Sequence, residues 1–203
     1  MPRILQLVTN RKGAYRRAKG ERTAEEESQL NLFAQRQAAT VVRLDAALSP
    51  FDSALMKDRT GAGSDARDAY LQAVRDGDRV ADACCNLGIL EAADGAYDDA
   101  VEWFARSLAA DPEHVEAHYN LGCLYLDMEM FAPARVHLAV AAARDPESAE
   151  LQFNLAVALA GVGQFAASVA ALRQFRKLSP DPDRDESAQK LLGELEKALQ
   201  ERA

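Results

Sequence analysis

The chain has 203 residues, of which 48% are hydrophobic but only 6% are aromatic, and it carries a net charge of −8. It contains no run of about eighteen apolar residues, so we expect no membrane-spanning helix. Its three cysteines, Cys84, Cys85 and Cys123, are odd in number and two are adjacent, which does not indicate a disulfide framework. Reduced thiols and a cytoplasmic, bacterial-type protein are therefore expected.

Residues 1–46 are predicted to form an N-terminal arm, and its first part is strongly basic. Residues 1–22 hold seven Lys and Arg side chains against Glu21, a net of +6, so the remaining residues together carry −14. This basic segment (residues 1–22) lacks helical periodicity, which predicts a flexible arm. It could contact nucleic-acid phosphates, although only Tyr15 is available for base stacking. It could instead fold onto the acidic body of the chain or an acidic partner.

Two hypotheses remain open for residues 23–46. Thr23 and Glu26 fit a capping box that would start a helix, and the alternative is a linker. Within this stretch Gln29, Leu30, Leu32 and Phe33 belong to the segment Q-L-N-L-F. The segment resembles the short peptide with which bacterial replication and repair proteins bind the sliding clamp. It supports an alternative function, a nucleic-acid- or replisome-associated adaptor.

Landmark residues then recur every 34 positions, which predicts stacked helical units rather than one globular core. The recurring positions include a leucine, a small residue, an aromatic residue, a second small residue and a proline. They are Leu87, Leu121 and Leu155; Gly88, Gly122 and Ala156; Tyr97, Phe131 and Phe165; Ala100, Ala134 and Ser168; Phe104, Leu138 and Leu172; and Pro112, Pro146 and Pro180.

The motif L-G-x2-Y at residues 121–125 and the motif A-x3-F at 100–104 resemble the tetratricopeptide repeat. The resemblance covers residues 81–182 and, more weakly, 47–80, and gives repeats near 47–80, 81–114, 115–148 and 149–182. It implies an all-α solenoid of about four helix pairs, followed by a C-terminal capping helix over 183–203. At the family's fourth position, where a large residue is usual, this chain has Cys84, His118 and Gln152.

Local signals predict where the helices lie. The first two repeats should hold helices over 50–58, 64–75, 81–93 and 97–110. Gly95 and Gly163 are placed in turns, where positive φ favours glycine. Pro112 and Pro146 are expected at the first position of the following helix. Asp185 is expected to cap the last one.

No pattern in the sequence indicates catalysis. The three histidines, His114, His118 and His137, form no metal-ligand spacing with the cysteines. Cys84 and Cys85 lack the two-residue spacer of a redox pair. The glycines track turns and helix crossings rather than a phosphate-binding loop. We therefore expect no enzyme activity, no metal and no cofactor.

The resemblance implies that the first helix of each repeat lines a concave groove that binds a peptide or a partner helix. The candidate groove residues are Asp82, Cys85, Asn86, Ile89, Ala92, Ala93, Glu116, Tyr119, Asn120, Cys123, Leu126, Asp127, Glu150, Phe153, Asn154, Val157, Ala160 and Gly161. Tyr119 and Phe153 are predicted as aromatic anchors for the ligand.

The polar groove residues suggest a ligand chemistry. The row Asn86, Asn120 and Asn154 could hold a ligand backbone, or it could only bond the neighbouring helix. Glu116 and Glu150 would repel a terminal carboxylate and favour an apolar segment with flanking Lys or Arg. The prediction is a non-catalytic protein-protein interaction scaffold that binds a protein or peptide, not a membrane.

Overall fold

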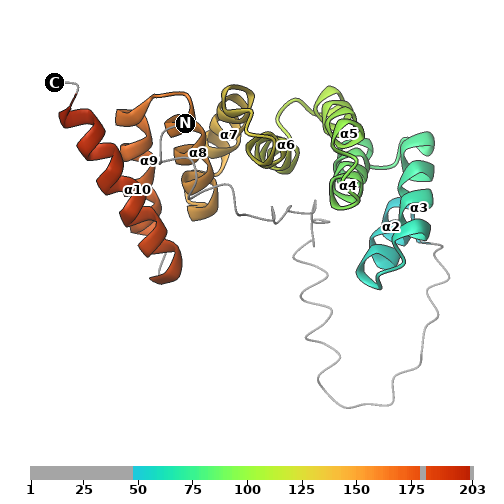
Figure 1. Cartoon of the computed structure of the whole chain (residues 1–203). Helices are drawn as coiled ribbons and strands as arrows, with labels where there is room; N and C mark the ends of the chain where they lie inside the picture. The colour runs from blue at the N-terminus through green and yellow to red at the C-terminus, as the bar shows by residue number, and fades with distance from the viewer. Residues whose placement is uncertain (1–47, 179–181, 202–203) are drawn as a thin grey trace, which may run out of the picture.

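The computed structural model describes residues 48–178 and 182–201, so the predicted N-terminal arm and the Q-L-N-L-F segment lie outside the described residues. The regular structure of the described part is entirely α-helical (Figure 1). The helices are α2 (Pro50–Arg59), α3 (Gly63–Asp76), α4 (Val80–Ala93), α5 (Tyr97–Ala110), α6 (Val115–Asp127), α7 (Phe131–Arg144), α8 (Ala149–Gly161), α9 (Phe165–Leu178) and α10 (Pro182–Gln200).

The helices pack as consecutive pairs, α2 with α3, α4 with α5, α6 with α7 and α8 with α9. Each pair stacks on the next through its second helix, and α10 packs against α9. The pairs follow an arch, from α2 and α3 at one end to α10 at the other, with the first helix of each pair on the inner side (Figure 1). The predicted all-α solenoid with a C-terminal capping helix is confirmed.

The helix boundaries agree closely with the predicted ones, with two corrections. Pro50 occupies the first turn of α2, where Ser49 caps the helix. Pro112 and Pro146 instead lie in the turns between repeats, because His114 and Ser148 cap α6 and α8 and place the first helical residue later. Helix α10 begins at Pro182, so Asp185 lies within its first turn rather than at its N-cap.

Small residues allow the two helices of a repeat to approach closely, as predicted. A Cβ atom added to Gly88 would lie 2.7 Å from Cε1 of Phe104, and one added to Gly122 would lie 2.6 Å from Cγ of Leu138. Both distances are far shorter than van der Waals contact. Glycine at these positions lets a large side chain of the second helix lie against the backbone of the first.

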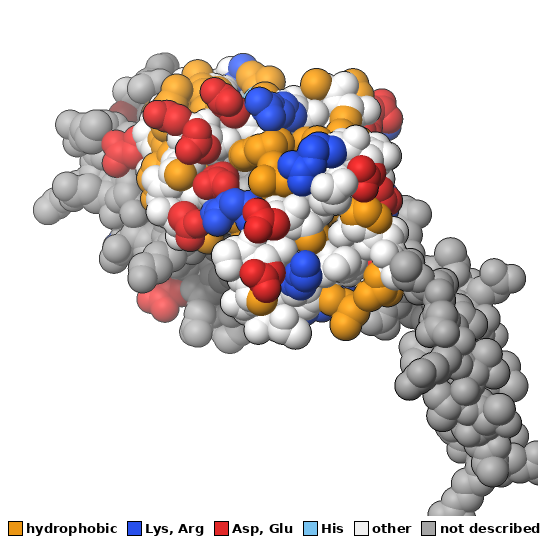
Figure 2. All heavy atoms as spheres, turned by 90° about the vertical axis from the view of Figure 1, so that its right-hand side faces the viewer, with side chains coloured by type: hydrophobic (Ala, Val, Ile, Leu, Met, Phe, Trp, Pro, Cys, Tyr) orange, Lys and Arg blue, Asp and Glu red, His pale blue; other side chains and the backbone are white. Residues whose placement is uncertain are grey.

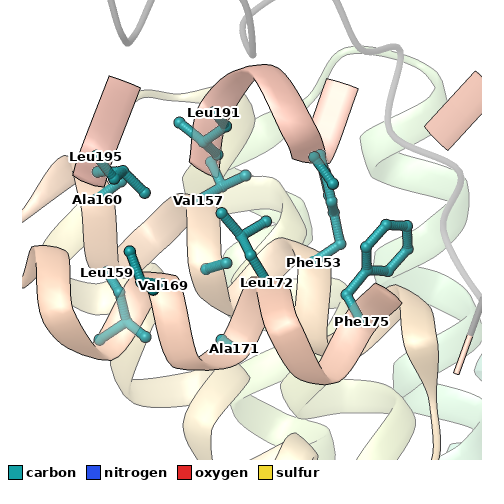
Figure 3. Packing of buried hydrophobic residues seen from close by; sticks show 12 residues of the cluster. Phe153, Val157, Leu159, Ala160, Val169, Ala171, Leu172, Phe175, Leu191 and Leu195 are labelled. Carbon is teal, nitrogen blue, oxygen red and sulfur yellow. The ribbon is translucent and has the colours of Figure 1, made fainter. Parts of the chain in front are cut away.

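Buried side chains form a series of clusters, each shared by neighbouring elements. Leu121 is 3% exposed and packs with Ile89 and Phe104 of the preceding repeat. At the C-terminal end, Leu191 and Leu195 of α10 join Val157 and Leu172 of the last repeat (Figure 3). Helix α10 therefore covers apolar surface that a further repeat would otherwise cover.

The polar residues at the fourth position of the repeat stabilise the turns between repeats. Nε2 of His118 lies 3.0 Å from the carbonyl oxygen of Pro112, and Nε2 of Gln152 donates to that of Pro146 at 3.3 Å. The two bonds are equivalent in consecutive repeats, because Gln152 lies 34 positions after His118 and Pro146 lies 34 positions after Pro112. The unusual residues at this position thus satisfy backbone carbonyls that the prolines leave exposed at the turn.

Candidate functional site

The inner side of the arch is formed by α2, α4, α6 and α8, and we call the part formed by α4, α6 and α8 the inner face. These three helices contain five carboxylates and neither Lys nor Arg, although Glu91 is paired with Arg67 of α3 and Asp82 with Arg79. The carboxylates belong to Asp82, Glu91, Glu116, Asp127 and Glu150. The basic residues of these repeats lie on the second helices α5, α7 and α9 instead. The inner face is therefore acidic and can attract cations.

Asp82 opens the acidic row and is held by two partners. Its carboxylate lies 2.7 Å from Arg79 and 3.0 Å from Nε2 of His114, and its side chain is 23% exposed. Burial raises the pKa of Asp82, but the hydrogen bond to His114 and the charge of Arg79 outweigh this, so the pKa lies below its usual range. Asp82 is thus ionised, and it fixes the start of α6 against α4.

His114 links this row to the cap of α6. Its Nδ1 accepts a hydrogen bond from the backbone amide of Ala117, while Nε2 faces Asp82. Burial lowers the pKa of His114, but the hydrogen bond and charge of Asp82, with the charges of Glu116 and Asp111, raise it above its usual value. His114 is thus the N-cap residue of α6.

Glu116 and Glu150 occupy the position of Asp82 in the next two repeats. The Glu116 side chain is 36% exposed, and its carboxylate lies 3.8 Å from Nδ1 of His114. Glu150 is half-buried and interacts with the hydroxyl of Tyr119. Burial, together with the neighbouring Cys123 and Glu150, raises the pKa of Tyr119, so the hydroxyl stays protonated. Glu116 is thus more accessible than Asp82 to a cationic group from outside.

The asparagine row connects successive inner helices. Nδ2 of Asn120 donates to Sγ of Cys85 at 3.7 Å, and Nδ2 of Asn154 lies 3.3 Å from both the hydroxyl of Tyr119 and Sγ of Cys123. All three asparagines, Asn86 included, are buried. Of the two hypotheses for this row, these contacts match bonding to the neighbouring helix.

The two predicted aromatic anchors are not exposed. Tyr119 is 1% exposed and Phe153 is 7% exposed, and the Phe153 ring packs edge-on against Phe175 with 5.2 Å between centroids. Ile89, Cys123, Val157, Ala92 and Ala160 are buried as well, whereas Ala93 and Asp127 are exposed. Gly161 allows a close approach to Phe131 rather than offering a contact. The inner face thus has a buried apolar floor, with carboxylates above it.

A histidine pair between α6 and α7 was not predicted from the sequence. Nδ1 of His118 lies 3.0 Å from Nδ1 of His137, and the Tyr125 ring stacks on His137. Because Nε2 of His118 donates to Pro112, its Nδ1 accepts from His137. Burial and the neighbouring His118 lower the pKa of His137. The described residues contain no group of three or more His, Cys, Asp or Glu side chains placed to hold a metal ion.

The cysteines are buried as free thiols. Burial raises the pKa of Cys85 far above its usual value, so this thiol stays protonated. Since the thiolate is the nucleophile, Cys85 is suited to packing and to accepting the hydrogen bond from Asn120 rather than to nucleophilic chemistry.

Outside the inner face the charges are mixed. Basic and acidic side chains are interspersed with apolar ones over the end of the arch formed by α2 and α3 (Figure 2). Arg67 of α3 contacts Glu91 at 2.9 Å and Asp94 at 2.6 Å, which ties the first repeat to the second. Among the helices of the described part, none combines the length and hydrophobicity needed to cross a membrane.

Comparisons with solved structures find the same fold. The chain is similar to YrrB, described as a TPR protein with an unusual peptide-binding site, at 19% identity and a TM-score of 0.67, covering 75% of this chain and 77% of that one. It is similar to MamA of AMB-1 at 24% identity and a TM-score of 0.63, covering 74% and 80%. It also resembles MamA from Desulfovibrio magneticus RS-1 at 22% identity and a TM-score of 0.58, covering 71% and 92%.

The sequence itself identifies the family. No curated protein matches the chain. A family model, described as a tetratricopeptide repeat, matches residues 57–115 and 119–182, which is more than half of the chain. These segments coincide with the helix pairs that carry the 34-residue period. The chain therefore belongs to the tetratricopeptide-repeat family.

Proposed function

We propose that this protein is a non-catalytic scaffold whose inner face binds a peptide or a partner helix that carries both apolar and cationic side chains. The observation that supports the proposal is the charge separation between helices. Helices α4, α6 and α8 contain five carboxylates and no Lys or Arg, and the repeat period places them on one side. Such a face favours cationic ligands and disfavours anionic ones.

Within this site, residues take two roles. Asp82, Glu116, Asp127 and Glu150 contact the cationic groups of the ligand, with Asp127 the most exposed of the four. The remaining predicted site residues, Asn86, Ile89, Tyr119, Asn120, Cys123, Phe153, Asn154 and Val157, shape and stiffen the floor beneath the carboxylates. The structural similarity to YrrB, a TPR protein with a peptide-binding site, supports a peptide ligand.

The proposal can be tested with matched synthetic peptides that share one apolar core of Leu and Ile and differ only in their flanks, which are Lys, Gln or Glu. Binding to the full chain is measured by fluorescence anisotropy. We expect the Lys-flanked peptide to bind roughly tenfold more tightly than the Gln-flanked one, because its cationic side chains are attracted to the carboxylates of the inner face. This ratio corresponds to about 1.4 kcal/mol of binding free energy. Equal affinity for all three peptides, or preference for Glu flanks, would contradict the proposal.

A charge-reversal pair locates the binding surface. Glu116→Lys with Glu150→Lys should remove the preference for Lys flanks. The control, Glu102→Lys with Glu147→Lys, makes the same change in net charge at exposed positions on α5 and in the turn before α8. The control should retain the preference. Helical content and thermal melting, followed by circular dichroism, show whether each variant is folded.

The alternative, a nucleic-acid- or replisome-associated adaptor, depends on residues outside the described part of the chain. It predicts that Leu32→Ala with Phe33→Ala abolishes binding to a purified bacterial sliding clamp, whereas Glu116→Lys with Glu150→Lys leaves it intact. Clamp binding with this pattern, together with no binding of the Lys-flanked peptide, would favour the adaptor.

A further inference from the structure

We propose that the basic segment of this chain, residues 1–22, is a tethered ligand of its own inner face. The inference rests on the proposed function of that face and names an occupant for it. It is supported by charge, by the composition of the segment and by the length of the chain that joins the two.

Charge complementarity is the first argument. The basic segment has a net charge of +6, and the three helices of the inner face contribute five negative charges and no positive ones. Helices α7 and α9 carry Arg135, Arg144, Arg173, Arg176 and Lys177 without an acidic residue and so repel the segment, whereas α5 holds Asp98, Asp99 and Glu102 beside Arg106. Charge therefore favours contact of this segment with the inner face over contact with α7 or α9.

The composition of the segment is the second argument. Ile4, Leu5, Leu7 and Val8 form a short apolar run, followed by Arg11, Lys12, Arg16, Arg17, Lys19 and Arg22. This is an apolar segment with a cationic flank, the ligand chemistry that the acidic row favours. The apolar run can contact half-buried Leu126 and Ala149 beside the floor, while the Arg and Lys side chains reach Glu116 and Glu150.

The chain that joins the basic segment to α2 is long enough for the segment to contact the inner face. The basic segment is joined to α2 by 25 residues, 23–47, and the chain enters the described part at the exposed Leu48. A flexible chain of this length spans about 25–30 Å on average, and a helix of the same length spans about 38 Å. Neighbouring helices pack about 8–10 Å apart, so the six packing steps from α2 to α8 amount to at most about 60 Å, within the roughly 80 Å that 25 extended residues can span. A tether that fits its target gives an effective concentration in the millimolar range.

A tethered ligand would compete with any external one. The apparent affinity of an external peptide equals its intrinsic affinity multiplied by the fraction of molecules in which the inner face is open. An external partner must therefore either exceed the tethered segment in affinity or bind when the segment is engaged elsewhere. The segment would thereby set a threshold for partner binding.

Protection from an arginine-specific protease tests this inference in the full chain. The rate of cleavage after Arg11 is measured by mass spectrometry at low salt for the parent and for Glu116→Lys with Glu150→Lys. We expect cleavage in this variant to be about tenfold faster, which corresponds to a loss of about 1.4 kcal/mol of docking. The control, Glu102→Lys with Glu147→Lys, should behave like the parent. Raising the salt concentration should accelerate cleavage of the parent.

A charge swap provides the reciprocal test. Adding Arg16→Glu and Arg17→Glu to the inner-face variant should restore slow cleavage after Arg11, because each charge then meets its opposite again. Equal cleavage rates in the parent and the inner-face variant would overturn the inference. So would protection that grows with protein concentration alongside dimer mass in light scattering, because the occupant would then be the segment of a second copy.

Deleting residues 1–22 separates this inference from the proposed function. If both hold, the deletion variant binds the Lys-flanked peptide more tightly than the full chain does. If the peptide binds equally well with and without the segment, the tethered-ligand inference fails and the proposed function stands. If neither protein binds it, both fail.

Discussion

At the residue scale, one position in the turn inside each repeat has a left-handed backbone, and in one repeat the residue there is not suited to it. Residues 61, 95, 129 and 163 are spaced by 34, and all four adopt positive φ. Three are glycine, but the third repeat has Glu129, at φ 57°. Left-handed backbone costs a residue with a Cβ atom about 1–2 kcal/mol, which glycine does not lose.

We therefore expect Glu129→Gly to stabilise the protein by about 0.5–1 kcal/mol, the relief of strain being partly offset by the greater freedom of glycine in the unfolded chain. Urea denaturation followed by circular dichroism measures this change. Gly95→Ala and Gly163→Ala are the matched controls and should destabilise by about 1 kcal/mol. A lower stability of Glu129→Gly would show that the Glu129 side chain makes a contact that outweighs the strain.

The pair Asp82 and His114 should make stability depend on pH. The pKa of His114 is raised on folding, so its contribution is complete below about pH 6.5 and is lost as the pH rises through the raised value. The pKa of Asp82 is lowered on folding, so its contribution is complete above about pH 4 and is lost at lower pH. The pair therefore stabilises most between these limits.

Asp82→Asn should accordingly cost about 1 kcal/mol more at pH 5.5 than at an alkaline pH where His114 is neutral. The part of the cost that comes from Arg79 stays constant across this range, because Arg79 remains charged. Thermal or urea unfolding at several pH values gives the comparison, with His114→Asn as a background in which the pH dependence should vanish. A cost independent of pH would contradict the assignment.

At the element scale, helix crossings are set by single small residues. Gly122→Ala should destabilise by about 1 kcal/mol, because overpacking against Cγ of Leu138 outweighs the better helix propensity of alanine. In a Leu138→Ala background the obstacle is gone, and the same change should stabilise by up to about 1 kcal/mol. Equal effects in both backgrounds, measured by denaturation, would show that the helices separate rather than compress Leu138.

The helices could be predicted closely because the 34-residue landmarks set the phase of each unit. The predicted helix 97–110 matches α5, and the positive φ of Gly95 and Gly163 is confirmed. The starts of α6 and α8 could not be predicted from the prolines alone. Side chains of His114 and Ser148 accept the backbone N–H bonds that define those starts, and His is not a usual cap.

The rows of the candidate site could also be predicted, but not their exposure. A repeat period places equivalent residues on one face whatever they are, so the acidic row was evident from the sequence. Burial of Tyr119 and Phe153 depends on how closely the inner side chains pack, which no single repeat encodes. The contact of His118 with His137 likewise depends on the crossing of α6 and α7.

At the scale of the whole molecule, the arch turns a local pattern into an extended surface. The last three repeats each contribute one carboxylate at their second position, and stacking aligns Asp82, Glu116 and Glu150. The three side chains belong to first helices of different repeats, and the packing of these repeats brings them to the same side. Because the first helices lie on the inner side of the arch (Figure 1), these carboxylates gather on one side of the molecule. Helix α10 ends the stack by burying Leu191 and Leu195.

The central claim is that ligands bind the inner face, and backbone amide chemical shifts test it most directly. A uniformly ¹⁵N-labelled full chain is titrated to saturation with the Lys-flanked peptide. The account predicts that the largest shift changes fall on amides of α4, α6 and α8, especially around Glu116 and Glu150. Changes concentrated on α5, α7 and α9, or no changes at saturating peptide, would contradict it.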